Sequence, residues 1–237
     1  MNDTTTPLRR VALGRIAPLI LTFTLIAALV ACGSAPQVAD WQVQSHTAAQ
    51  RAVQAYLQGR DRVATAELAL ARKELSSTGR ADLMANAELV QCAAKSASLV
   101  WEECTGFAPL RADATPAQRA YAGFLRGQVT PADIELLPPA QRAAAKALTP
   151  DAATTAVAAM GDPLSQLVAA SALLQSGKAS PALIALAVDT ASAQGWRRPL
   201  LAWLGVQALR AERDGAPDEA AKVRRRMDLV QQRPVAP

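Results

Sequence analysis

Residues 163–199, PLSQLVAASALLQSGKASPALIALAVDTASAQGWRRP, predict two successive α-helices of similar length. Each apolar run follows a helix-capping residue and a proline, with Asp162 before the first run and Ser180 before the second. Proline suits the first helical position because its missing N–H would have no intrahelical partner there. Gly177 and Gly195 stand where the two helices should end. The stretch therefore predicts a helical hairpin.

The same pattern repeats along the C-terminal part of the chain. Four prolines lie 18 residues apart, namely Pro163, Pro181, Pro199 and Pro217. A small residue recurs six positions after each of the first three prolines, at Ala169, Ala187 and Gly205. We expect four successive helix starts in one antiparallel stack, with these small residues facing neighbouring helices so that the backbones can approach.

The composition of the whole chain favours helices. Alanine supplies 54 of the 237 residues, and Leu, Gln, Glu and Arg are abundant. These residues lose little side-chain freedom in a helix. Aromatic residues make up only 4%, and no segment alternates apolar and polar residues as a half-buried strand would. We therefore predict an all-α fold built from antiparallel helical hairpins.

Three amphipathic helices are expected in the N-terminal half, at about residues 39–57, 61–75 and 80–99. Helical spacing gives the third of these one apolar stripe, formed by Leu83, Ala87, Val90 and Ala94. Such stripes are buried against neighbouring elements. Short connections make the helices antiparallel neighbours.

The helical pattern breaks before Thr115, and this break suggests a division of the chain. Thr115-Pro116 and Thr130-Pro131 each predict a cap followed by proline at the first helical position. We expect an N-terminal helical region over residues 32–110, after a short tether, and a C-terminal stack of helical hairpins over residues 111–237. The C-terminal half would then form a short α-solenoid.

The chain begins with a basic segment, an apolar run and a cysteine, in that order. Three arginines up to Arg15 precede a 15-residue run, Ile16 to Val30, which is interrupted only by one proline and two threonines. This order is typical of a secretory signal. The alternative is an uncleaved transmembrane anchor, but the run is shorter than the roughly 20 residues that a spanning helix needs.

The end of this run, Leu29-Val30-Ala31-Cys32, resembles the lipobox of bacterial lipoproteins. The resemblance implies that residues 1–31 are a signal peptide and that Cys32 receives a lipid and becomes the first mature residue. Lipoproteins of this kind carry a diacylglyceryl thioether and usually an acylated amine, and at least two acyl chains are needed for stable anchoring. Gly33, where Asp would retain the protein in the inner membrane, implies an outer-membrane location facing the periplasm.

Residues 199–234 are similar to one tetratricopeptide repeat. Leu204-Gly205 matches the Leu-Gly of the first repeat helix, residues 218–221 resemble the start of the second, and Pro234 falls where the repeat closes. The chain departs from the pattern at Ala208, where an aromatic residue is usual. The resemblance implies a stack of helical hairpins, and it names no binding specificity.

Charge and motifs exclude several classes of function. The formal charge of the chain is +5. Residues 1–31 hold three Arg and one Asp, so the remainder carries only +3. This charge is too small to indicate nucleic-acid binding.

His46 is the single histidine, so a typical zinc site is not expected. Glu102 and Glu103 are interpreted as solvated surface carboxylates. No catalytic motif is present, and we predict no enzymatic activity, no metal and no cofactor.

Cys92 and Cys104 are the remaining cysteines. An even pair in an exported chain tends to form a disulfide. Two buried free thiols and a redox-active pair are the alternatives, although the Cys-x-x-Cys spacing of redox pairs is absent.

Two basic segments are candidates for contact with a partner. Trp196, followed by Arg197 and Arg198, is predicted to be a half-exposed anchor. Arg224 and Arg225 belong to the densest basic cluster of the chain, which either is a solvated terminal helix or contacts an acidic partner or anionic lipid head groups.

These features favour a non-enzymatic scaffold or adaptor in an envelope complex. The protein would contact the membrane through the lipid on Cys32 and would bind a protein partner, because stacked helices present a surface that can hold a segment of another protein. The runner-up is a carrier or chaperone that binds an apolar ligand or lipid between helices. A hydrolase would require a pocket with convergent polar groups.

Overall fold

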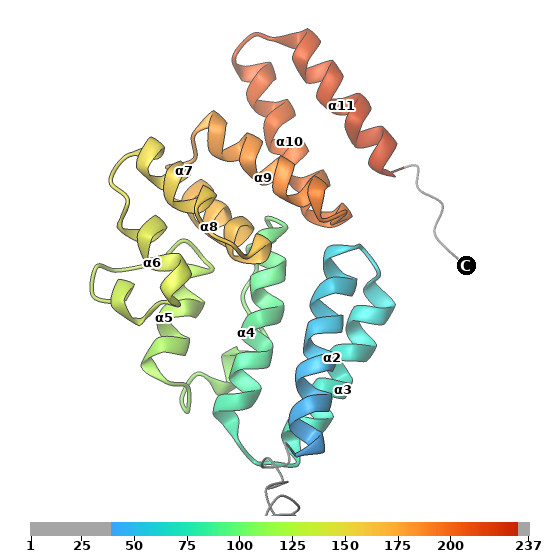
Figure 1. Cartoon of the computed structure of the whole chain (residues 1–237), viewed down its shortest axis with the longest axis vertical. Helices are drawn as coiled ribbons and strands as arrows, with labels where there is room; N and C mark the ends of the chain where they lie inside the picture. The colour runs from blue at the N-terminus through green and yellow to red at the C-terminus, as the bar shows by residue number, and fades with distance from the viewer. Residues whose placement is uncertain (1–38, 232–237) are drawn as a thin grey trace, which may run out of the picture. The chain divides into compact units, whose positions relative to one another are not determined.

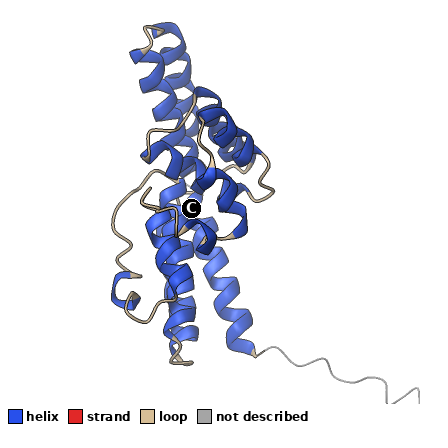
Figure 2. Ribbon diagram, turned by 90° about the vertical axis from the view of Figure 1, so that its left-hand side faces the viewer, coloured by secondary structure: helices blue, strands red, loops and turns tan. Residues whose placement is uncertain are grey.

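The computed structural model describes residues 39–231, and over this range it consists of helices and loops without a strand (Figures 1 and 2). The ten α-helices are α2 (Asp40–Leu57), α3 (Asp61–Ser76), α4 (Ala81–Ala97), α5 (Pro116–Phe124), α6 (Pro139–Lys146), α7 (Pro150–Ala158), α8 (Pro163–Gln175), α9 (Pro181–Ala193), α10 (Arg197–Arg213) and α11 (Pro217–Gln231). Two short 3₁₀ helices, η1 (Ala108–Leu110) and η2 (Ile134–Leu136), lie in the connections. The predicted all-α fold is confirmed.

Helix α4 is the central element of this body. In Figure 1 it lies between α2 and α5, and it also contacts α3 and α8. Small and apolar residues on several of its sides are buried, among them Ala85, Leu89 and Ala93. The expected stripe is only partly correct, because Val90 is 41% exposed. Helices α2 and α5 pack on either side of the Val90 row and leave it uncovered.

The two predicted threonine caps before α6 have different outcomes. Thr115 caps α5 in a capping box, in which its hydroxyl accepts from Gln118 N and its own N–H donates to Gln118 Oε1. Thr130 does not start an α-helix, contrary to the prediction. Its hydroxyl donates to Asp133 Oδ2 over 2.6 Å, and this local bond closes a turn that leads into η2.

The proline series marks helix starts, as predicted, with one shift. Helices α8, α9 and α11 begin at their prolines. Helix α10 begins at Arg197, so Pro199 is its third residue. Pro199 still lies in the first turn, where the backbone N–H groups have no intrahelical partner, and the helix therefore tolerates it.

The caps of α8 and α9 also follow the prediction. The Asp162 carboxylate accepts from Ser165 N over 2.8 Å, and the Ser180 hydroxyl accepts from Leu183 N over 3.0 Å. Gly195, which separates α9 from α10, has a φ of +63°, a conformation that glycine adopts without steric cost.

The small residues of the series differ in their surroundings. Ala169 and Ala187 are buried, with exposed fractions of 0% and 2%, as the stacking hypothesis requires. Gly205 does not fit, because it is only partly buried and a Cβ placed on it would have no neighbour within 4 Å. The expectation that Gly205 allows close helix contact is therefore wrong.

One hydrophobic core runs through the described residues, from Val53 to Val223, and it crosses residue 110 without a break. Its largest fully buried side chain is Trp203 on α10. None of the helices between residues 39 and 231 is sufficiently long and apolar to cross a lipid bilayer.

Candidate functional site

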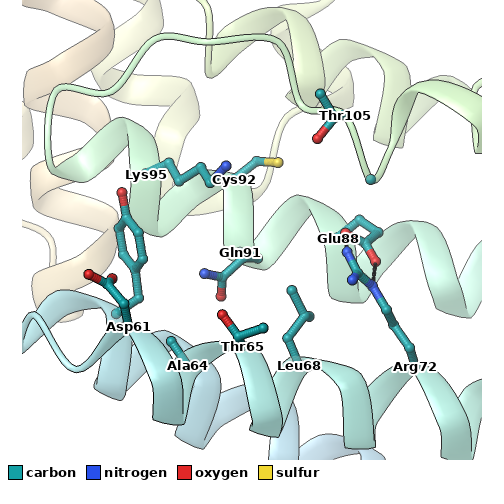
Figure 3. A pocket seen from close by; sticks show the side chains of 12 residues that line it. Asp61, Ala64, Thr65, Leu68, Arg72, Glu88, Gln91, Cys92, Lys95 and Thr105 are labelled. Atoms are coloured by element: carbon teal, nitrogen blue, oxygen red, sulfur yellow. Dashed lines mark hydrogen bonds and ion pairs between the residues drawn. The ribbon is translucent and has the colours of Figure 1, made fainter.

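A polar pocket of about 290 Å³ lies between α3, α4 and the loop that follows α4 (Figure 3). Helical spacing builds both of its main walls. The α3 wall presents Asp61, Ala64, Thr65, Leu68 and Arg72, and the α4 wall presents Glu88, Gln91, Cys92 and Lys95. Thr105 and Gly106 of the loop and Tyr56 of α2 complete the lining. We call this cavity the polar pocket.

An ion pair between the two helices fixes one end of the polar pocket. Arg72 Nε lies 2.5 Å from Glu88 Oε1, and Arg72 Nη2 lies 2.8 Å from Glu88 Oε2. The Glu88 side chain is only 5% exposed, whereas that of Arg72 is 46% exposed. The hydrogen bond to Glu88 raises the pKa of Arg72. Two parallel bonds of this kind set the geometry as well as the charge balance.

The loop beside this ion pair is held close to α4. A Cβ at Gly106 would overlap the Glu88 carboxylate, so any larger residue at this position would displace that carboxylate from its present place beside Arg72. Cys92 and Cys104 also join the loop to α4, because their sulfur atoms lie at disulfide-bonding distance and their Cα atoms are 5.8 Å apart. This geometry agrees with the predicted disulfide.

The middle of the polar pocket holds two polar groups without partners among residues 39–231. Gln91 is buried, and its Oε1 accepts no hydrogen bond. In Figure 3 the Gln91 amide extends from α4 toward Thr65 on α3. Lys95 is half-buried in the same lining and takes part in none of the ion pairs of the described residues. The lining therefore holds one positive charge without an ion-pair partner and one buried acceptor without a hydrogen bond among the described residues.

Arg198 of α10 borders the other end of the polar pocket. Its guanidinium lies 4.2 Å from the centre of the Tyr56 ring, its Nε donates to the Tyr56 carbonyl over 2.9 Å, and it forms an ion pair with Asp61. Burial raises the pKa of the Tyr56 hydroxyl, and the charge of Arg198 partly opposes this shift. Arg198 thus connects α10 to the α2–α3 turn.

The structure corrects the role predicted for Trp196. Its side chain is 4% exposed, and its indole N–H donates to Gln54 Oε1 on α2 over 3.0 Å. It is therefore not a half-exposed anchor, because a helix 142 positions earlier in the sequence covers it. Arg197 beside it donates to the carbonyl of Gln231 over 3.3 Å.

The two C-terminal arginines are both exposed on α11. Arg224 forms an ion pair with Glu212 of α10. Arg225 takes part in no ion pair within residues 39–231. Of the five residues predicted for partner contact, Trp196 is buried, whereas Arg197, Arg198 and Arg224 each contact a neighbouring helix.

Four other residues considered in the sequence are not among the residues that line the polar pocket. Cys32 lies outside the described residues, so its lipidation stays a prediction. His46, Glu102 and Glu103 are exposed. Within residues 39–231 no three His, Cys, Asp or Glu side chains are grouped so that they could hold a metal ion.

An apolar groove runs along the exposed row of α4. It consists of two adjoining hollows of about 320 and 430 Å³, which share Asn86 and Val90. The first hollow lies toward α2 and includes Trp41, Ala49, Leu75, Leu83 and Ala87. The second lies toward α5 and η2 and includes Leu89, Ala117, Tyr121, Leu136, Leu137, Pro138 and Pro139. We call this feature the α4 groove.

Neither the polar pocket nor the α4 groove was predicted from the sequence. One signal of the pocket was present: Glu88, Gln91 and Lys95 follow helical spacing within an otherwise alanine-rich helix. Polar residues on a helix that is covered on several sides must face a partner or a cavity. The matching wall of α3 could not be assigned without knowing how the two helices pack.

Comparison with known proteins yields no family model that matches this chain, and no curated protein or solved structure similar to it.

Proposed function

We propose that this chain is a lipid-anchored, periplasm-facing adaptor without enzymatic activity, and that the α4 groove is its docking surface. The observation that carries the proposal is the exposure of Val90, 41%, on a helix whose other sides are largely buried. Leu136, at the far side of the groove, is 40% exposed. Grouped exposed apolar side chains with polar groups at their rim are typical of protein-interaction sites.

The occupant that fits the α4 groove is the apolar face of a helix from another protein. The two hollows flank the Val90 row of α4 and share Asn86 and Val90, so the apolar face of one helix laid over this row would contact both. Polar groups lie between and beside the hollows, where Gln118 Nε2 donates to Asn86 Oδ1 over 2.7 Å. Such groups suit the polar edge of an amphipathic helix better than a lipid tail, which offers no hydrogen bonds.

The position of the groove in the sequence agrees with a partner at the membrane. Trp41, in the first turn of α2, lines the first hollow. Residues 32–39 precede that helix, and eight residues span at most about 28 Å when fully extended. A lipid on Cys32 would therefore keep the groove close to the membrane surface, where an envelope protein with a helix near the bilayer is accessible.

The polar pocket argues against the two rival functions. A carrier of lipid needs an apolar cavity between helices, whereas the lining of the cavity between α3 and α4 includes four charged side chains and the Gln91 amide beside its apolar residues. A hydrolase needs a nucleophile beside a base. The Glu88 carboxylate is occupied by two bonds to Arg72, and no hydrogen bond of the described residues joins Thr65 to a base. The polar groups of the pocket therefore suit binding better than acid–base catalysis.

Site-specific photocrosslinking tests the proposal. A photoreactive side chain is introduced at position 90 of the full chain, and the matched control carries it at Val63 of α3, which is 42% exposed and lies outside the α4 groove. We expect a discrete protein adduct in membranes from position 90 and none from position 63. No adduct at position 90, an adduct with lipid alone, or the same adduct from both positions would overturn the proposal.

A further inference from the structure

We propose that the polar pocket binds a small hydroxycarboxylate, with Lys95 Nζ holding the carboxylate and Gln91 Oε1 accepting a hydrogen bond from a ligand hydroxyl. This site lies on the side of α4 that faces α3, whereas the α4 groove lies between α2 and α5. The inference is therefore independent of the adaptor function, and either can fail without the other.

The charge of the ligand follows from the ion pairs around the pocket. Arg72 is neutralised by Glu88, and Asp61 is neutralised by Arg198. Lys95 takes part in no ion pair of the described residues, so the charged lining residues together with Arg198 carry one unmatched positive charge. A ligand with a single negative charge balances it. A multiply charged anion would leave uncompensated negative charge beside Glu88.

The hydroxyl of the ligand follows from Gln91. A buried acceptor without a hydrogen bond destabilises the folded chain unless another group satisfies it. Gln91 Oε1 is such an acceptor, and Gln91 lies in the pocket lining one helical turn before Lys95. The Oε1 atom has almost no accessible surface, so the Gln91 amide turns toward the pocket when a ligand hydroxyl reaches it. A donor placed next to a carboxylate that binds Lys95 would satisfy it, and a hydroxyl on a neighbouring carbon provides that donor.

The size and walls of the pocket limit the ligand further. A volume of about 290 Å³ lies near the lower end of the range for small-molecule sites, so the ligand is small. Ala64 and Leu68 give the lining an apolar part against which a short carbon chain can pack. Cys92–Cys104 and the close approach of Gly106 to Glu88 hold the loop in place, so little ordering is needed on binding.

Isothermal titration calorimetry on the full chain with its cysteine pair oxidised tests the inference. The probes are L-lactate and D-gluconate, which represent the small and large members of the class. Sorbitol has the hydroxyls without the carboxylate, and hexanoate has the carboxylate without hydroxyls. We expect at least one hydroxycarboxylate to bind with a stoichiometry of about one, and both controls to bind at least about tenfold more weakly. Failure of both probes at millimolar concentration, or equal binding of the controls, would overturn the inference.

Three variants separate binding from folding. Lys95→Gln removes the counter-charge, and we expect it to weaken binding by about tenfold or more. Gln91→Met removes the buried acceptor, so binding should weaken while thermal stability stays unchanged or rises. Lys178→Gln, an exposed lysine outside the pocket, is the control for loss of one charge. Lys95→Gln protein that binds as tightly as the unaltered chain would contradict the assignment, as would weakening of the same size in Lys178→Gln.

Discussion

The indole nitrogen of Trp203 on α10 donates a hydrogen bond of 3.0 Å to the backbone carbonyl of Ala97, at the end of α4. The two residues are 106 positions apart, and both are fully buried. This contact joins the C-terminal hairpins to the central helix. It satisfies one of the last carbonyl groups of α4, which have no partner within the helix itself.

Trp203→Phe should therefore destabilise the whole fold. The change leaves the Ala97 carbonyl buried without a donor and removes part of the packed indole. We expect a loss of about 1–3 kcal/mol in the free energy of unfolding. Urea denaturation followed by circular dichroism measures it. Trp41→Phe is the control, because Trp41 is only half-buried and makes no hydrogen bond among the described residues, and its effect should be much smaller. Equal losses in both variants would show that the hydrogen bond contributes nothing.

The two glycines with contrasting surroundings give a second prediction. Gly205→Ala in the interior of α10 should raise the stability by about 0.5–1 kcal/mol, because alanine is the better helix former and its Cβ meets no neighbour within 4 Å. Gly106→Ala should lower the stability, because its Cβ would overlap the Glu88 carboxylate. Thermal denaturation of both variants checks this. The same sign of change for the two would contradict the packing described here.

Local sequence patterns predicted most of the helices. Capping residues, prolines and glycines act within one or two turns, which is why the starts of α8 and α9 and the ends of α2 and α3 could be assigned. Thr130 failed because the competing partner, Asp133, offered a turn with equally local bonds. The sequence pattern alone could not decide between a helix cap and a turn at Thr130.

Contacts between residues far apart in the sequence could not be predicted from sequence patterns. The sequence around Trp196 resembles an exposed anchor, but in the structure α2 covers the side chain. Val90 fits the apolar stripe of α4, yet the packing of α2 and α5 leaves its row open. The docking surface and the polar pocket both depend on which sides of α4 are covered. Which sides are covered is determined by how helices that are far apart in the sequence pack against α4.

The cysteine pair provides a third prediction. If Cys92 and Cys104 are bonded in the exported protein, mass spectrometry after alkylation without reductant will find neither thiol modified. Their separation of 12 residues closes a loop, and removal of the bond by Cys92→Ala should lower the stability by about 2–4 kcal/mol. Two alkylated thiols in correctly exported protein would refute the disulfide.

The lipid anchor is tested through Cys32. Cys32→Ser removes the atom that would carry the diacylglyceryl group, and no helix between residues 39 and 231 can span the membrane. We expect this variant to stay unprocessed or to lose its membrane association. Immunoblots of soluble and membrane fractions, compared with the unaltered chain, report the result. A Cys32→Ser protein that is cut after Ala31 and still fractionates with the outer membrane would rule out lipid anchoring.

The most direct test of the adaptor function is affinity purification of the full chain from membranes, with Val90→Glu and Val63→Glu compared. The two valines have nearly equal exposure, 41% and 42%, so a charge at either site should leave the fold intact. Our account predicts that the protein crosslinked from position 90 copurifies with the unaltered chain and with Val63→Glu, and that Val90→Glu loses it. Retention of the partner by Val90→Glu, with folding verified by circular dichroism, would contradict the assignment of the α4 groove.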